Sequence, residues 1–223
     1  MPLLIAIDGP VGAGKSTISE EVARRLSILH LDTGAMYRAA GLAAIRAGAS
    51  LDDEEAVSAA VLKADITVAY VDSAQRTYLN GEDVSKAIRT EQAGEAASRV
   101  SCYKAVRKRM VDAQRALAKN TSMLLDGRDI GTIVLPEATA KIYLTASREA
   151  RAKRRMNQLR LAGDKTPYDE ILKDIISRDE RDVNREVDPL RKASDAVTVD
   201  SSKLTFEQTV QSILRIVEDK IHG

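Results

Sequence analysis

The residues best suited to chemistry lie near the N-terminus, in Gly9-Pro10-Val11-Gly12-Ala13-Gly14-Lys15-Ser16, which has the spacing G-x-x-x-x-G-K-S. Glycines let a backbone fold around a phosphate with its N–H groups pointing inward. In such a loop Lys15 places its charge on the β- and γ-phosphates of a nucleotide, and the Ser16 hydroxyl binds Mg²⁺. We therefore predict Mg²⁺ as cofactor and a nucleotide-binding loop of Gly9, Pro10, Val11, Gly12, Ala13, Gly14, Lys15, Ser16 and Thr17.

This loop requires a strand before it and a helix after it. Residues 3–7 form a short apolar run that is typical of a buried strand. In residues 17–26 the apolar residues Ile18, Val22 and Leu26 recur every four positions, which predicts one buried helix face. The N-terminus of that helix would direct the positive end of its dipole at the phosphates.

Strand and helix patterns alternate along most of the chain. Further strands are predicted at residues 28–31, 122–125, 141–145 and 196–199. The alternation predicts an α/β fold with a five-stranded parallel sheet flanked by helices. Ligands of such sheets bind beyond the carboxyl ends of the strands, so the segments to examine are 8–16, 32–38 and 126–129.

Residues 63–85 interrupt the alternation. Residues 66–71 alternate as a strand does, residues 76–79 form a second short run, and Asn80-Gly81 is a preferred two-residue hairpin turn. We predict a small antiparallel meander that belongs to an insertion and not to a separate domain. Residues whose side chains cap the N-terminus of a helix are predicted at Asp52, Ser147, Thr166 and Thr205.

Composition narrows the classes of protein. The 223 residues suit a single domain, and 34 basic residues against 33 acidic ones give no argument for binding nucleic acid or a membrane. The single cysteine, Cys102, excludes an internal disulfide and is expected to pack, which favours the reducing cytoplasm. Two histidines, His30 and His222, are too few for the usual zinc sites, and they argue against a Ser-His-Asp hydrolase.

A phosphate-binding loop occurs in switches, motors and kinases. The chain lacks an [NT]-K-x-D guanine-reading motif and repeated domains, which disfavours the first two. Arginines follow predicted strands and recur on later helices, where a second phosphorylated substrate would need them. Phosphoryl transfer depends on positioning and on cations around the developing charge, so these observations favour a small kinase.

Three further motifs resemble those of the bacterial cytidylate kinases. The segment 32–38 is similar to D-[ST]-G-x-x-Y-R, the segment 126–132 to D-G-R-D-x-G-T, and the segment 178–185 to R-D-x-R-D-x-N-R. The resemblance runs in register from the phosphate loop to about Ala196. It implies a P-loop kinase core at residues 1–32, 120–150 and 167–223, a substrate-binding insertion at about 33–119 and a short lid at about 151–166.

The resemblance also implies the roles of individual residues. Arg38 and Arg128 match positions that hold the substrate phosphate, which suits the planar fork of a guanidinium. Asp129 would accept a hydrogen bond from the N4 amino group of cytosine, whereas uracil presents an acceptor there. The complete set implied for the substrate is Thr33, Tyr37, Arg38, Ser98, Arg107, Arg128, Asp129, Arg178, Arg181, Asp182 and Arg185, and the set implied for catalysis is Lys15, Arg128, Arg181 and Arg185.

Several of these residues have alternative interpretations. Tyr37 could pack only, Ser98 could simply be tolerated on an alanine-rich helix, and the arginines of segment 178–185 could form surface ion pairs. Arg154 and Arg155 match basic lid residues that clamp ATP, although a basic helix face also suits nucleic acid.

Asp8 and Asp126 both follow core strands, and either could hold water on magnesium. We favour Asp126.

The sequence therefore predicts a cytoplasmic, monomeric enzyme of pyrimidine nucleotide metabolism that transfers a phosphoryl group from ATP to CMP or dCMP. A kinase for another small acceptor, such as UMP, is the nearest alternative. A nucleotide-dependent RNA-binding protein that uses the basic residues 148–160 is the alternative from another class.

Overall fold

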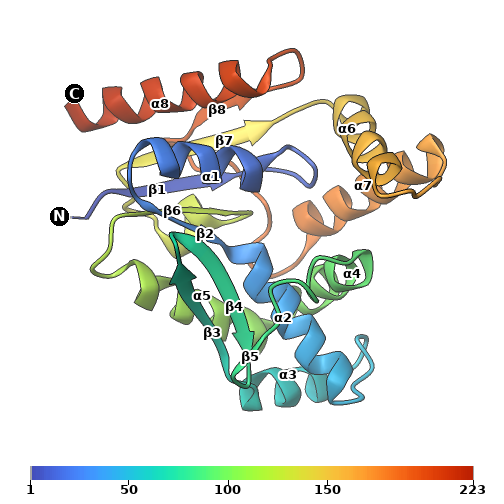
Figure 1. Cartoon of the computed structure of the whole chain (residues 1–223). Coiled ribbons are helices and arrows are strands. Elements are labelled where there is room, and N and C mark those ends of the chain that lie inside the picture. The colour runs from blue at the N-terminus through green and yellow to red at the C-terminus, as the bar shows by residue number, and fades with distance from the viewer. Residues whose placement is uncertain (1, 223) are drawn as a thin grey trace.

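The computed structural model describes residues 2–222 and has a five-stranded parallel sheet at its centre (Figure 1). The strands lie in the order β2 (Leu29–Asp32), β6 (Met123–Gly127), β1 (Leu4–Asp8), β7 (Ala140–Thr145) and β8 (Val197–Asp200). Each bound lies within two residues of its prediction, and the predicted parallel sheet is confirmed. Strand β1 is central, with β6 and β2 on one side and β7 and β8 on the other, so the loop after β1 opens at the centre of the sheet.

Alternate residues of β1 face opposite sides of the sheet, as the period of a strand requires. Ile5 and Ile7 pack with helices α1 (Lys15–Arg25) and α8 (Phe206–His222). Ala6 packs on the other side with α2 (Thr33–Arg46), α5 (Lys104–Ala118) and the short π-helix η1 (Ile130–Val134). Helices therefore cover both faces of the sheet.

The predicted meander is confirmed as a second, antiparallel sheet of β3 (Ile66–Val71), β4 (Ala74–Leu79) and β5 (Glu82–Asp83). Asn80 and Gly81 have φ angles of 51° and 82°, the positive pair that a type I′ hairpin turn needs. Helices α3 (Glu54–Lys63) and α4 (Glu91–Val100) flank the meander in the chain.

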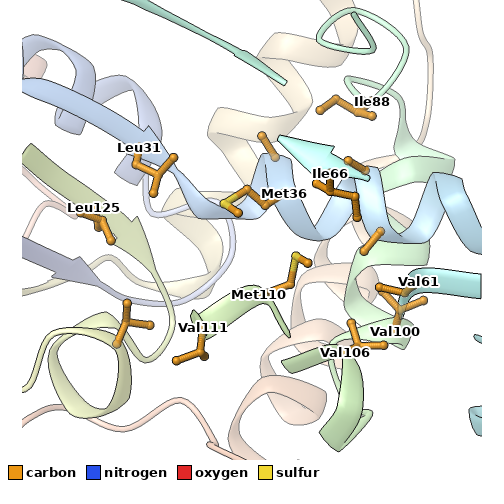
Figure 2. Packing of buried hydrophobic residues seen from close by; sticks show 14 of the residues in the cluster. Leu31, Met36, Val61, Ile66, Ile88, Val100, Val106, Met110, Val111 and Leu125 are labelled. Atoms are coloured by element: carbon orange, nitrogen blue, oxygen red, sulfur yellow. The ribbon is translucent and has the colours of Figure 1, made fainter. Parts of the chain in front are cut away.

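One hydrophobic core joins the meander to the main sheet (Figure 2). Leu31 of β2 and Leu125 of β6 belong to the same buried cluster as Met36 of α2, Ile66 of β3 and Met110 of α5. The meander is thus held against the parallel sheet by shared packing.

Helices α6 (Arg148–Leu161) and α7 (Tyr168–Asn184) form a pair with a small cluster of its own around Ala152, Ile171 and Ile175. The predicted lid, residues 151–166, covers most of α6 and the loop that follows it; its closing movement stays a prediction. None of the helices between residues 2 and 222 is both long enough and apolar enough to span a bilayer.

Two of the predicted helix starts are confirmed. The Ser147 hydroxyl accepts a hydrogen bond from Ala150 N at 3.1 Å. Thr205 and Gln208 each accept from the backbone N–H of the other, at 3.2 and 2.9 Å.

Two predicted starts are wrong by one residue. Asp53, not Asp52, caps α3, because Asp52 instead forms an ion pair with Arg99. Pro167, not Thr166, precedes α7, because the Thr166 hydroxyl donates to Asp164 at 2.6 Å. In both cases the side chain predicted to cap the helix interacts instead with a nearby charged residue.

Candidate active site

A cavity of about 340 Å³ opens beyond the carboxyl ends of β1, β2 and β6. Segments far apart in the chain line it, from the loop after β1 to helix α7. The predicted site residues on its wall are Val11, Gly12, Gly14, Lys15, Ser16, Thr17, Thr33, Tyr37, Arg38, Ser98, Asp126, Arg128, Asp129, Arg178, Asp182 and Arg185. Predicted residues of both the donor and the acceptor set therefore share one cleft. The predicted residues that do not line it are Gly9, Pro10, Ala13, Arg107, Arg154, Arg155 and Arg181.

The loop between β1 and α1 has the conformation that its glycines permit. A Cβ atom on Gly9 would lie 2.0 Å from the carbonyl oxygen of Leu144 in β7, so only glycine fits against that strand. Gly14 precedes α1 with a φ angle of 88°, a left-handed conformation that favours glycine. The helix N-terminus is thereby directed into the cleft.

Lys15 is buried at the base of this loop. Its Nζ donates to the carbonyl oxygens of Gly9 and Pro10, each at 2.8 Å. Burial, followed by the charge of Arg128, lowers the pKa of Lys15 to about 7. A bound phosphate would offer this ammonium group the negative charge that the carbonyl oxygens lack.

Ser16 and Asp126 form the predicted metal-site pair, with 2.7 Å between Ser16 Oγ and Asp126 Oδ2. His30 Nε2 lies 3.2 Å from the other oxygen of Asp126. Burial alone would raise the pKa of Asp126, but the hydrogen bond and charge of His30, together with Lys15, lower it. An ionised carboxylate and a hydroxyl are hard oxygen donors of the kind that Mg²⁺ prefers.

Asp8 has a different environment. Its two carboxylate oxygens accept from the backbone N–H groups of Ile130 and Gly131, each at 2.7 Å. Burial raises the pKa of Asp8 to about 6 in spite of these donors. Asp8 thus anchors the start of η1, and Asp126 is the carboxylate that faces Ser16.

Arg38 and Arg128, the predicted phosphate ligands, each pair with a carboxylate on the cavity wall. Arg38 Nη2 donates to Asp32 at 2.8 Å, and Arg128 Nε donates to Asp182 at 2.6 Å. The charge and hydrogen bond of Arg128 lower the pKa of Asp182 against the effect of burial. Both guanidinium groups are held before a substrate arrives.

Asp129 is the centre of a buried charge cluster. Arg107 and Arg185 donate to its two oxygens, and Arg107 also donates to Asp188 at 2.8 Å. Burial outweighs both arginines and raises the pKa of Asp129. Arg107 is only 1% exposed and lies behind the cavity wall, with its guanidinium 5.7 Å from the ring centre of Tyr37. Its contact with a base therefore stays a prediction.

Thr33 and Ser98 also lie on the cavity wall. The Thr33 hydroxyl donates to the carbonyl oxygen of Asp126 at 2.7 Å, which ties the start of α2 to the end of β6. Ser98 lies on α4. Ser101 also lines the cavity, and the sequence analysis did not single out this second serine.

The arginines of α7 meet an acidic residue of α4. Arg181 donates to both carboxylate oxygens of Glu95, at 2.5 and 2.8 Å, and Arg178 lies 3.9 Å from the same carboxylate. Arg178 also pairs with Asp174 at 3.0 Å. The ion pairs of the alternative interpretation therefore exist, and the two with Glu95 link α7 to α4.

Arg154 and Arg155 are not among the residues that line the cavity, although Arg154 donates at 3.5 Å to the carbonyl oxygen of Ala13 in the phosphate loop. Arg154 donates to the carbonyl oxygen of Ser201 at 2.5 Å, and Arg155 lies 4.0 Å from Glu91. The neighbouring Arg151 was counted in the basic run but given no role. It donates to the loop carbonyl of Val11 at 2.9 Å and pairs with Asp179.

Sequence reasoning missed three supporting residues, Arg151, Glu95 and His30. Asp179, the partner of Arg151, lies inside the R-D-x-R-D-x-N-R segment, so that motif contained a clue to Arg151. Glu95 and His30 act through partners more than 80 residues away in the chain, for which no spacing rule exists.

The glycine-rich loop after the central strand, the buried lysine and the serine–aspartate pair define a P-loop nucleotide-binding protein of the kinase type. The fold is similar to that of a gluconokinase from Sinorhizobium meliloti, with a TM-score of 0.51 and 12% identity over 98% of this chain and 93% of that one. An uncharacterized protein from Eubacterium ventriosum gives a TM-score of 0.52 at 12% identity, covering 97% and 98%. These two likenesses concern the fold alone.

Sequence comparison is more specific. The family model described as cytidylate kinase matches residues 5–219. A cytidylate kinase from Nocardia farcinica is 47% identical, covering 99% of this chain and 95% of that protein. Another, from Carboxydothermus hydrogenoformans, is 44% identical over 97% of both chains. The chain belongs to the cytidylate kinase family, and the resemblance of its motifs is confirmed.

Proposed function

We propose that this protein transfers the γ-phosphoryl group of ATP to CMP or dCMP and so forms CDP or dCDP for pyrimidine nucleotide metabolism. The observation that carries the proposal is the single cleft that Lys15 and Ser16 share with Arg38, Arg128 and Asp129. The first two residues suit a polyphosphate, and the other three suit a nucleoside monophosphate with an amino group on its base.

The reaction needs little covalent chemistry from the protein. A phosphate oxygen of CMP, already ionised at neutral pH, attacks the γ-phosphorus, and the bond to the bridging oxygen of ADP breaks. No general base is required. In this proposal Lys15, Arg128, Arg181 and Arg185 offset the charge that spreads over the transferring group.

Ser16 and Asp126 are the residues proposed to hold Mg²⁺, Ser16 directly and Asp126 through water. The bound ion would neutralise charge on the β- and γ-phosphates. The 2.7 Å hydrogen bond between Ser16 and Asp126 supports this assignment, because it fixes both oxygens at the loop that binds phosphate.

Asp129 is proposed to read the base, through the N4 amino group of cytosine. UMP would place an acceptor opposite this carboxylate, at a cost of about 1–3 kcal/mol. The cluster of Arg107, Arg185 and Asp129 supports the proposal, since it fixes the carboxylate.

The proposal includes three features of the whole protein. It acts as a monomer, it is cytoplasmic, and residues 151–166 close over the nucleotides and exclude water. Arg154 would have to leave the carbonyl oxygen of Ser201 to reach a phosphate in that closed state.

The deciding experiment measures ADP release from ATP and Mg²⁺ in the presence of CMP, dCMP, UMP or AMP at equal concentrations. Fast turnover with CMP and dCMP and slow turnover with UMP and AMP is the expected result. Equal rates with UMP would refute base reading by Asp129 but keep the kinase. Lack of turnover with all four would refute the proposed function.

A further inference from the structure

Strand β2 forms one edge of the parallel sheet, and side chains of the meander cover its outer side. An edge strand presents backbone N–H and C=O groups without a neighbouring strand, and such groups need other partners when they are shielded from water. Tyr70 of β3 donates its hydroxyl to the carbonyl oxygen of His30 at 3.1 Å. Gln75 of β4 bonds to the next outward-facing residue of β2, Asp32.

Gln75 binds both backbone groups of Asp32. Its Oε1 accepts from Asp32 N at 2.7 Å, and its Nε2 donates to Asp32 O at 3.3 Å. Since a backbone N–H only donates, the orientation of the side-chain amide is fixed. The amide therefore takes the place that a neighbouring strand would have, at the last residue of β2.

Asp32 in turn fixes a residue of the acceptor site. One of its carboxylate oxygens accepts from Ala35 N at 2.9 Å and caps α2, and the other accepts from Arg38 at 2.8 Å. Both Asp32 and Arg38 line the cleft on one side and a second cavity of about 310 Å³ on the other. Gln75 lines that second cavity, directly behind the pair.

Arg38 retains hydrogen-bonding capacity for a ligand. Its Nε is buried and has no hydrogen-bond partner among residues 2–222. A guanidinium binds a phosphate bidentately only when its plane has the right direction. Asp32 binds Arg38, and Asp32 is itself held by β6 on one side and by Gln75 on the other.

We propose that Gln75 is a positioning residue for the acceptor phosphate, which acts through the backbone of Asp32 on Arg38. The inference rests on the proposed function of Arg38 as a ligand of the CMP phosphate. It assigns the meander a role in substrate affinity. Gln75 itself touches neither substrate.

The test uses the full chain with Gln75→Met, which keeps the length of the side chain. It removes both hydrogen bonds to Asp32, together with the 3.3 Å bond that Gln75 Nε2 donates to the Thr77 hydroxyl within β4. Loss of one or two such bonds is expected to raise the Kd for CMP, measured by calorimetry, and the KM for CMP by about three- to tenfold. The kcat and the KM for ATP should stay within about twofold of the wild type, because the hydrogen bonds of Gln75 go to Asp32 and Thr77 and not to the donor loop. A purely structural role would instead lower Tm and leave CMP affinity unchanged.

Tyr70→Phe is the matched control, because it removes a hydrogen bond to the same edge strand that does not lead to Arg38. It should leave the Kd for CMP unchanged. Equal CMP affinity in Gln75→Met and wild type, or equal losses in both variants, would overturn the inference and leave the proposed function intact. A wild-type protein without turnover of CMP would overturn both.

Discussion

The donor and acceptor sides of the cleft hold their cations with different partners. On the donor side, Lys15 and Arg154 donate to backbone carbonyl oxygens. Arg151 is an exception, since it donates to the loop carbonyl of Val11 and also pairs with Asp179. On the acceptor side, Arg38 and Arg128 pair with carboxylates. A carbonyl oxygen is a neutral partner that a phosphate can replace with a gain in Coulomb energy, whereas a carboxylate already supplies that energy.

The acceptor side is nearly balanced in charge. Six arginines, Arg38, Arg107, Arg128, Arg178, Arg181 and Arg185, meet six carboxylates, Asp32, Asp129, Asp174, Asp182, Asp188 and Glu95. These pairs fix the direction of each guanidinium before substrate binds, and they cancel much of its attraction for other anions. We therefore expect the donor loop to attract anions more strongly. The acceptor side is expected to supply the geometry for substrate binding and the selectivity among substrates.

Removal of Lys15 is the strongest test of the donor side. Lys15→Ala should lower kcat by about 10²–10³-fold, because one cation at the developing charge of the transferring group is lost. Steady-state ADP release measures this effect. Lys203→Ala, which removes an exposed lysine, is the control and should leave kcat unchanged. Near-normal turnover of Lys15→Ala would contradict the whole comparison.

Asp8 tests whether backbone groups alone stabilise a buried charge. Its pKa is raised from 3.8 to about 6, so the folded protein binds the proton more tightly than the unfolded chain. The raised pKa of Asp8 therefore adds to the unfolding free energy at low pH. This contribution is fully present below about pH 4 and is lost as the pH rises through about 6, and it amounts to about 3 kcal/mol in total.

Urea unfolding of wild type and Asp8→Asn between pH 4 and 7.5 measures this loss. The difference in unfolding free energy between the two proteins should shift by about 3 kcal/mol in favour of the variant as pH rises. Comparison of the two proteins cancels the titration of other groups. A difference that does not depend on pH would show that the two N–H donors offset the burial of Asp8.

The parallel sheet could be predicted because its information is local. Each strand is a short apolar run, and the glycine-rich loop has a fixed spacing, so the positions of Lys15 and Ser16 followed directly. The Asn80-Gly81 turn is another local rule that the structure confirms. Patterns of this kind depend on neighbours within a few residues and on little else.

Side chains that choose among several partners could not be predicted. Asp52 had the right spacing for a cap but pairs with Arg99 of another helix. Ion pairing by Arg181 was one of two interpretations, but its partner, Glu95 of α4, could not be named from the sequence; its role toward the substrate stays a prediction. Such choices depend on distances between segments that are remote in the chain, which one sequence does not contain.

Asp129 tests the selectivity that the comparison ascribes to the acceptor side. In Asp129→Asn the side-chain amide offers uracil O4 a donor, so the ratio of kcat/KM for CMP to that for UMP should fall about tenfold or more. Asparagine keeps the size of the side chain. Alanine is less suitable, because removal of a partner of the buried Arg107 costs about 3–5 kcal/mol of stability. An unchanged ratio in a folded variant would assign base reading to another residue.

Substitution of Glu95 should give the smallest effect, and it tests the ion pairs between α4 and α7. Its carboxylate occupies Arg181 and lies near Arg178, so it competes with a substrate for both. The Glu95 side chain is 40% exposed, and exposed ion pairs contribute only about 0.2–1 kcal/mol. Glu95→Gln should therefore lower the KM for CMP by about twofold, with less change at high salt.

Glu91→Gln, one turn earlier on α4, is the control and should leave the KM for CMP unchanged. A higher KM in Glu95→Gln would mean that the carboxylate holds the two arginines in place for the substrate, as the carboxylates deeper in the cleft do.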